Sequence, residues 1–166
     1  MNLTLAGLAL ALAILLLNLR TWWKSPGRDP KTLIPFGGGF TMGALALACG
    51  GLLGWGAYMA VSGANRGGDK GVSGTTGQNA GDSLNGSSVG ALTPEGAVVV
   101  FLLFVLAVVT LRAAGKQDKR RMLGGAFCGA TLPATAGIAG ALAWLVPLVN
   151  QIGDVVRTTA ESGGLL

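Results

Sequence analysis

Four long runs of apolar residues constrain this chain more than any other feature of its sequence. They cover residues 3–19, about 34–62, about 96–111 and about 123–149, and none holds an Asp, Glu, Lys or Arg. A helix needs about 20 apolar residues to cross the hydrocarbon core of a bilayer, which is about 30 Å thick. The runs therefore predict four transmembrane helices, of which the first and third are short enough that Arg20 and Arg112 extend to the membrane interface.

The overall composition favours the same class of protein. Hydrophobic residues make up 51% of the chain and charged residues 11%, whereas a soluble domain has about 25% charged residues. The apolar runs are continuous and do not alternate, which is typical of spanning helices and not of barrel strands. We expect an all-α, multi-pass membrane protein of the bacterial inner (plasma) membrane.

The basic residues predict how the helices are oriented. Most of the twelve lie in the first and third connections between the runs, and the positive-inside rule places these two connections in the cytoplasm. The chain then forms two helical hairpins, residues 1–62 and 96–149, with both termini extracytoplasmic. The basic turns consist of Arg20, Lys24, Arg28 and Lys31, and of Arg112, Lys116, Lys119, Arg120 and Arg121.

Aromatic residues give a second indication of the membrane boundaries. Trp22 and Trp23 follow the first run directly. Trp55 and Trp144 each lie about 31 Å of helical rise beyond the start of a long run, with Tyr58 close to Trp55. Trp and Tyr are enriched at both membrane interfaces, so these residues predict two aromatic belts.

The segments outside the hairpins are polar. Residues 63–95 are rich in Gly, Ser, Asn and Thr, which predicts a flexible external loop that ends where Thr93-Pro94-Glu95 starts a helix. Residues 150–166 are expected to form an external tail.

Small residues recur at helical spacing in the second and fourth runs. Such residues let membrane helices approach closely, so these two runs are expected to form the packed centre, while the bulky first and third runs contact lipid. The packing could lie within one monomer or between subunits, and the number of small faces favours a homo-oligomer. The predicted packing residues are Gly39, Gly43, Gly50, Gly54, Gly125, Gly129, Ala136 and Gly140.

The two halves of the chain resemble each other. Each has a short bulky run, a basic turn, and a long glycine-rich run with a Trp near its outer end. The sequence Gly-Gly-Gly-Phe at 37–40 matches Gly-Gly-Ala-Phe at 124–127. This predicts a parallel duplication of a helical hairpin, with chance similarity between two Gly/Ala-rich helices as the alternative.

Residues that carry chemistry are scarce. The chain has no histidine, and its two cysteines, Cys49 and Cys128, lie inside apolar runs, where we expect them to pack as small residues. No paired carboxylates or metal-ligand clusters are evident in the sequence, and no charged group lies at bilayer depth. We therefore expect no enzyme activity, no catalytic residue, no cofactor and no metal. The basic residues form no face interleaved with aromatic residues, so direct nucleic-acid binding is not expected either.

One stretch carries a resemblance to a known group. Ser25-Pro26-Gly27-Arg28-Asp29-Pro30-Lys31, followed by Phe36-Gly37-Gly38-Gly39, resembles the small hydrophobic membrane proteins of actinomycete mobile elements, of which the Streptomyces plasmid spread (Spd) proteins are the nearest named group. The resemblance implies a scaffold or pore component in conjugative plasmid transfer, with a DNA-translocating ATPase or other membrane proteins as partners. A phage-encoded holin-type protein and a chromosomal membrane protein that binds a partner through its loops are the alternatives.

Overall fold

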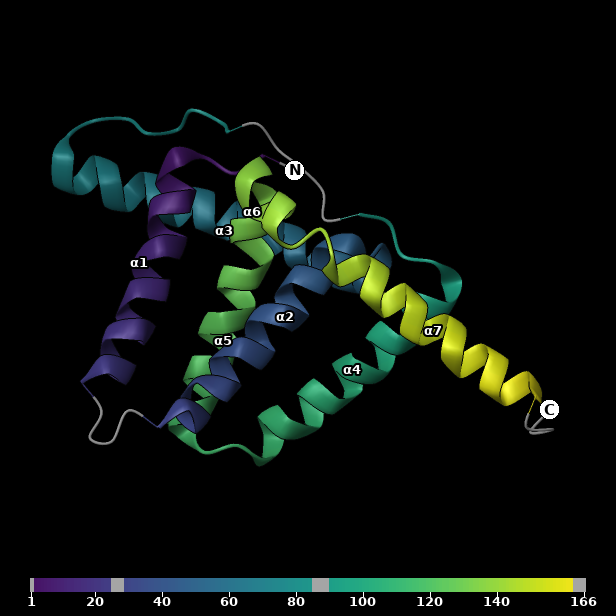
Figure 1. The fold of residues 1–166 in the computed structure, drawn as a ribbon. Coiled ribbons are helices and arrows are strands. Elements are labelled where there is room, and N and C mark those ends of the chain that lie inside the picture. The colour runs from purple at the N-terminus through teal and green to yellow at the C-terminus, as the bar shows by residue number, and fades with distance from the viewer. Residues whose placement is uncertain (1, 25–28, 85–89, 163–166) are drawn as a thin grey trace.

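Helices account for all the regular elements in the part of the chain that the computed structural model describes, which is residues 2–24, 29–84 and 90–162 (Figure 1). This confirms the all-α fold. The elements are α1 (Leu5–Trp23), the 3-10 helix η1 (Pro30–Leu33), α2 (Ile34–Ala48), α3 (Gly51–Thr76), α4 (Pro94–Ala113), α5 (Lys116–Thr131), the 3-10 helix η2 (Leu132–Ala134), α6 (Ala136–Ala141) and α7 (Leu145–Ser162).

Several of these helices are long and apolar enough to cross a membrane. Among the described residues, length and composition give three candidate spans: Leu5–Trp23, Pro94–Ala113 and Ala136–Ser162. A fourth arises if Pro30–Ala48 and Gly51–Thr76, which are bent by 110° at their junction, count as one broken span. Multiple candidate spans are the signature of an integral membrane protein.

The helices α2 and α5 form the centre of the molecule (Figure 1). They run side by side. On one flank α1 packs against α5, and on the other flank α4 lies next to α2. The helices α3 and α7 lie at the end where α1 and α4 begin: α3 packs against α1, and α7 packs against α4.

The structure differs from the expected second span, because residues 34–62 do not form one helix. The chain turns by 110° between α2 and α3. Cys49 is extended, and Gly51 has φ +64°, a left-handed conformation that favours glycine. The adjacent glycines Gly50 and Gly51 therefore permit an elbow where hydropathy alone predicts a continuous helix. By itself α2 reaches only about 22 Å, less than the thickness of a hydrocarbon core.

The expected external loop is shorter in the structure. Residues 63–76 form the polar second half of α3, which ends at Gly77 with φ +68°. The described part of the connection, residues 77–84 and 90–93, is not helical, and residues 85–89 lie outside the described range. Leu5 and Ala6 donate their N–H groups to the carbonyls of Asp82 and Ala80, at 3.1 Å each. The connection thus binds the start of α1.

The expected fourth span, residues 123–149, is also divided. Pro133 lies in η2, directly after α5, and its missing N–H prevents the α-helix from continuing unchanged. The short α6 and a turn at residues 142–144 follow before α7 begins. Residues 150–162, expected as a tail, belong to α7.

Candidate functional site

The interface between α2 and α5 is the closest helix contact that the predicted packing residues form. Gly39 is buried, and a Cβ added to it would overlap the carbonyl oxygen of Met122 and lie 3.0 Å from the backbone nitrogen of Ala126. Gly125 is buried as well, and its Cβ would overlap the carbonyl oxygen of Phe36. Only glycine lets the two backbones touch in this way. Both helices belong to the same chain, so the contact is an intrachain one.

These contacts repeat with the two helices exchanged. A Cβ on Gly43 would overlap the carbonyl oxygen of Ala126, and a Cβ on Gly129 would overlap that of Phe40. The shift along the chain from Gly39 to Gly125 equals the shift from Gly43 to Gly129. A local twofold axis that runs along the two parallel helices therefore relates α2 to α5.

The packing of α2 against α5 shows a repeat like the one in the sequence, with a register that differs by one residue. Duplication of a hairpin stays a prediction. The letters Gly-Gly-Gly-Phe and Gly-Gly-Ala-Phe pair Gly37 with Gly124, whereas the contacts pair Gly38 with Gly124 and Phe40 with Ala126. The register follows the glycines that face the partner backbone, and the exposed position Gly37 plays no part in it.

An asparagine of α3 binds the first turn of α1. The N–H and the hydroxyl of Thr4 donate to Oδ1 of Asn65 at 2.9 and 3.2 Å. The Nδ2 group of Asn65 donates to the carbonyl of Asn2 at 3.1 Å, and the Thr4 hydroxyl accepts the N–H of Gly7 at 3.0 Å. We call this arrangement the first asparagine clamp.

The same four hydrogen bonds occur between α7 and α4. The N–H and the hydroxyl of Thr93 donate to Oδ1 of Asn150 at 3.1 and 3.3 Å. Nδ2 of Asn150 donates to the carbonyl of Ala91 at 3.3 Å, and the Thr93 hydroxyl accepts the N–H of Gly96 at 3.1 Å. The second asparagine clamp therefore repeats, between α4 and α7, the pairing of α1 with α3.

Glycines make both clamps possible. A Cβ on Gly68 would overlap the carbonyl of Ala6, and a Cβ on Gly153 would lie 2.7 Å from the carbonyl oxygen of Glu95. An ion pair between Arg157 and Glu95, at 2.8 Å, adds to the second clamp alone.

Sequence reasoning missed the clamps, although a signal was present. The segment Leu-Thr-x-x-Gly occurs at 3–7 and again at 92–96, and Asn-x-x-Gly-Asp occurs at 65–69 and again at 150–154. Both Asn-x-x-Gly-Asp segments fell in regions that composition alone classifies as loop or tail.

The other predicted packing residues lie apart from this interface. Gly54 is buried at the elbow, where a Cβ would overlap the carbonyl of Cys49. Gly50, Ala136 and Gly140 are exposed, and a Cβ on either of the two glycines meets no atom within 4 Å.

The predicted basic residues gather at one end of the molecule, where α1 and α4 end and α2 and α5 begin; we call it the basic end (Figure 1). Arg121 bridges the two connections there, because its guanidinium donates to the carbonyl of Thr32 at 3.0 Å. Arg28 lies outside the described residues. The remaining members are exposed or half-buried: Arg20, Lys24, Lys31, Arg112, Lys116, Lys119 and Arg120.

The predicted aromatic residues divide between the two ends. Trp22 and Trp23 lie at the basic end, with their rings 5.9 Å apart in an edge arrangement, and Nε1 of Trp22 donates to the carbonyl of Asp29 at 3.2 Å. Trp55 and Tyr58 are exposed on α3, and Trp144 is exposed in the turn before α7.

Polar chemistry is sparse around these contacts. The described residues include no group of three or more His, Cys, Asp or Glu that could hold a metal ion. Both cysteines are free, and the buried Cys128 donates its Sγ–H to the carbonyl of Ala11 at 3.4 Å. The arrangement serves close packing and hydrogen bonding between helices.

No family model, curated protein or solved structure matches this chain.

Proposed function

We propose that the protein is a non-enzymatic membrane scaffold whose twofold core stands in the bacterial plasma membrane. The observation that carries the proposal is the reciprocal backbone contact of α2 and α5 through Gly39, Gly43, Gly125 and Gly129. Such contact fixes the spacing of two helices without specific polar chemistry, as a structural component of a membrane assembly requires.

The proposed orientation puts the basic end in the cytoplasm and both termini outside. The positive-inside rule supports it, because the basic turns lie together at one end of the fold. The exposed Trp55, Tyr58 and Trp144 then lie toward the opposite interface.

The proposed partners are the lipid bilayer, further copies of the chain and a protein at the basic end. The exposed small residues Gly50, Ala136 and Gly140 leave room for contacts between subunits. The resemblance to plasmid spread proteins suggests a DNA-translocating ATPase as the protein partner and conjugative transfer as the process.

A plasmid-spread assay tests this role. Replacing Lys116 and Lys119 by Gln should leave membrane insertion intact, since the first basic turn still fixes the orientation, and should reduce spread of the element between neighbouring cells. The matched control is Arg66→Gln with Lys70→Gln, which removes two charges at the opposite end.

The deletion strain gives the decisive comparison. If it transfers and spreads its element as the parent does, the conjugative role is wrong, and lysis timing in a phage context is the next assay. Reduced spread in the Lys116/Lys119 variant at normal membrane levels supports the scaffold.

A further inference from the structure

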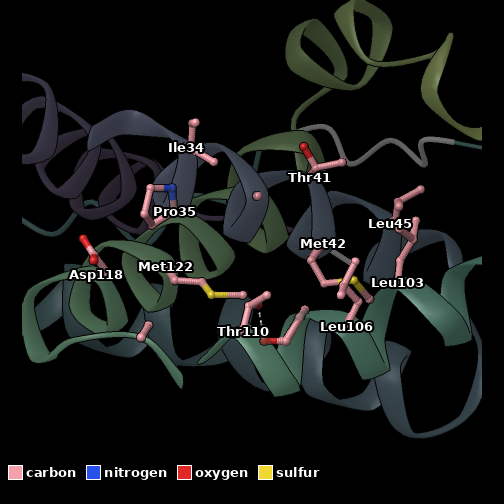
Figure 2. A pocket seen from close by; sticks show the side chains of 13 residues that line it. Ile34, Pro35, Thr41, Met42, Leu45, Leu103, Leu106, Thr110, Asp118 and Met122 are labelled. Atoms are coloured by element: carbon pink, nitrogen blue, oxygen red, sulfur yellow. Dashed lines mark hydrogen bonds between the residues drawn. The ribbon is translucent and has the colours of Figure 1, made fainter. Parts of the chain in front are cut away.

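A groove of about 490 Å³ lies between α2, α4 and the start of α5 (Figure 2). Its walls are mostly apolar, with Ile34, Met42 and Leu45 on α2 and Leu103 and Leu106 on α4. Figure 2 shows Asp118 at one end of the groove and Leu45 with Leu103 at the other.

The hydroxyl groups in the walls are already satisfied. Thr41 donates to the carbonyl of Gly37 at 3.0 Å, and Thr110 donates to the carbonyl of Ala107 at 2.9 Å. The carboxylate of Asp118 lies in the first turn of α5, where a helix favours negative charge. Between Asp118 and Leu45 the groove therefore offers its occupant apolar surface.

The internal symmetry shows why the groove exists. On the other side of the core, a Cβ on Gly124 would lie 3.4 Å from Nδ2 of Asn18 and 3.6 Å from Cγ2 of Ile14, because α1 packs onto α5. The position equivalent to Gly124 is Gly38, which lines the groove and whose Cβ would meet no atom within 4 Å.

The wall of the groove across from Gly38 belongs to α4, which is the counterpart of α1. Leu103 and Ala107 are the equivalents of Ile14 and Asn18, by the shift that relates Thr4 to Thr93, and both line the groove. On one side of the core, α1 covers Gly124. On the other side, α4 lies farther from α2 and leaves the equivalent Gly38 uncovered.

The length of the groove fits one leaflet. Ile34 and Leu45 line its two ends on α2, and the helical rise between them is about 16 Å. This is close to half of a hydrocarbon core of about 30 Å. One hydrocarbon chain from the leaflet at the basic end would therefore extend along the groove.

The charge at the mouth indicates the headgroup. Asp118 and Ala114 line the end of the groove next to the connection between α4 and α5. Arg112 in the last turn of α4, and Lys116 and Lys119 in the first turn of α5, flank this connection and outnumber the carboxylate of Asp118. Cations at this position attract lipids with a net negative headgroup.

We propose that the groove binds one acyl chain of an anionic phospholipid, with its headgroup beside Lys116 and Lys119. This inference rests on the proposed membrane placement and goes beyond the scaffold role. It assigns a ligand to the flank of the core where α4 leaves Gly38 uncovered.

Native mass spectrometry of the delipidated full-length protein tests the site with phosphatidylglycerol and with phosphatidylethanolamine of the same chains. The wild type should retain phosphatidylglycerol in preference to phosphatidylethanolamine. Gly38→Leu should fill the groove and lose that lipid, and Ala107→Phe should do so from the opposite wall. Gly37→Leu is the matched control, because it has equal space for a side chain but does not line the groove.

Lys116→Gln with Lys119→Gln should remove the preference for phosphatidylglycerol while both lipids still bind. Equal retention of phosphatidylglycerol in wild type, Gly38→Leu and Ala107→Phe would overturn the site, as would equal retention of both lipids by the wild type. Gly38→Leu and Ala107→Phe keep Lys116 and Lys119, so these two variants, measured in the plasmid-spread assay as well, separate failure of the lipid site from failure of the scaffold role.

Discussion

Asn65 and Asn150 each satisfy groups at the start of a helix that have no partner within that helix. The first N–H groups of α1 and α4 have no carbonyl acceptor within their own helix, and water is scarce near a bilayer core. One side-chain amide binds Thr and the carbonyl two residues before it, which ties two helices together at a single point.

Removing a clamp should lower the stability of the folded protein. We expect Asn65→Leu and Asn150→Leu each to cost about 1–3 kcal/mol, because the N–H group of Thr4 or Thr93 loses its acceptor. Thermal unfolding in mild detergent measures the loss, and Gln151→Leu, at an exposed neighbouring position, is the control.

The two clamps share no hydrogen-bond partner, so the double variant should show the sum of the single effects. An Asn65→Leu protein that melts like the wild type would show that this clamp contributes nothing to stability.

Single polar residues were the hardest feature to predict from this sequence. Asn65 is consistent with a flexible loop or with a helix, because its role depends on Thr4, which lies far away in the chain. The basic residues were simpler to group, since their position relative to the apolar runs already puts them in the connections at one end of the helices. The repeated Asn-x-x-Gly-Asp segment carries the missing information only when the two halves of the chain are compared.

At the scale of elements, α2 and α5 were predictable as a packed centre because Gly39 and Gly43, like Gly125 and Gly129, recur four residues apart. Sequence alone left open whether these faces pack within one chain or between chains, since the same glycine surface suits both. The structure brings all four together inside one chain.

Bulky substitutions at this interface should disrupt the monomer itself. Gly43→Ile and Gly129→Ile place a branched side chain against a backbone carbonyl that cannot give way, so we expect a large loss of thermal stability and faster proteolysis. Gly37→Ile on the same helix, where a Cβ meets no atom within 4 Å, and Val105→Ile on α4 should behave like the wild type.

Crosslinking in mild detergent tells whether these glycines pack within one chain or between subunits. If Gly43→Ile keeps the stability of the wild type but loses only crosslinked oligomers, the glycine faces an adjacent subunit and the intrachain contact is wrong.

The elbow between α2 and α3 could not be predicted from hydropathy, which adds up apolar residues without regard to direction. Leu52, Trp55 and Met59 continue the apolar run of α2 and remain exposed after the 110° turn. The left-handed conformation of Gly51 permits the bend between α2 and α3, and an average of hydropathy over the run does not detect such a conformation.

At the scale of the whole molecule, the orientation is open to direct measurement. Single cysteines at Ser83, Gln117 and Ser162 in a cysteine-free protein would meet an impermeant thiol reagent in intact cells. We expect labelling at Ser83 and Ser162 and protection at Gln117, because the basic end lies in the cytoplasm in the proposed orientation. A fourth position, Ser25, lies outside the described residues and should be protected as well.

Permeabilised cells provide the control, since every site should then react. Labelling of Gln117 in intact cells, with protection of the other two described sites, would reverse the orientation and place the groove in the opposite leaflet.

The covalent link between the two twofold-related halves has a consequence for how this molecule can change. In a dimer of identical chains, one gene encodes both subunits, so every substitution appears twice and the two flanks of the core must stay alike. In this chain each half mutates by itself. Asn18 and Ile14 could close one flank while Ala107 and Leu103 left the other open. In this chain, therefore, one side of the core can differ from the other while the contact between α2 and α5 keeps its twofold form.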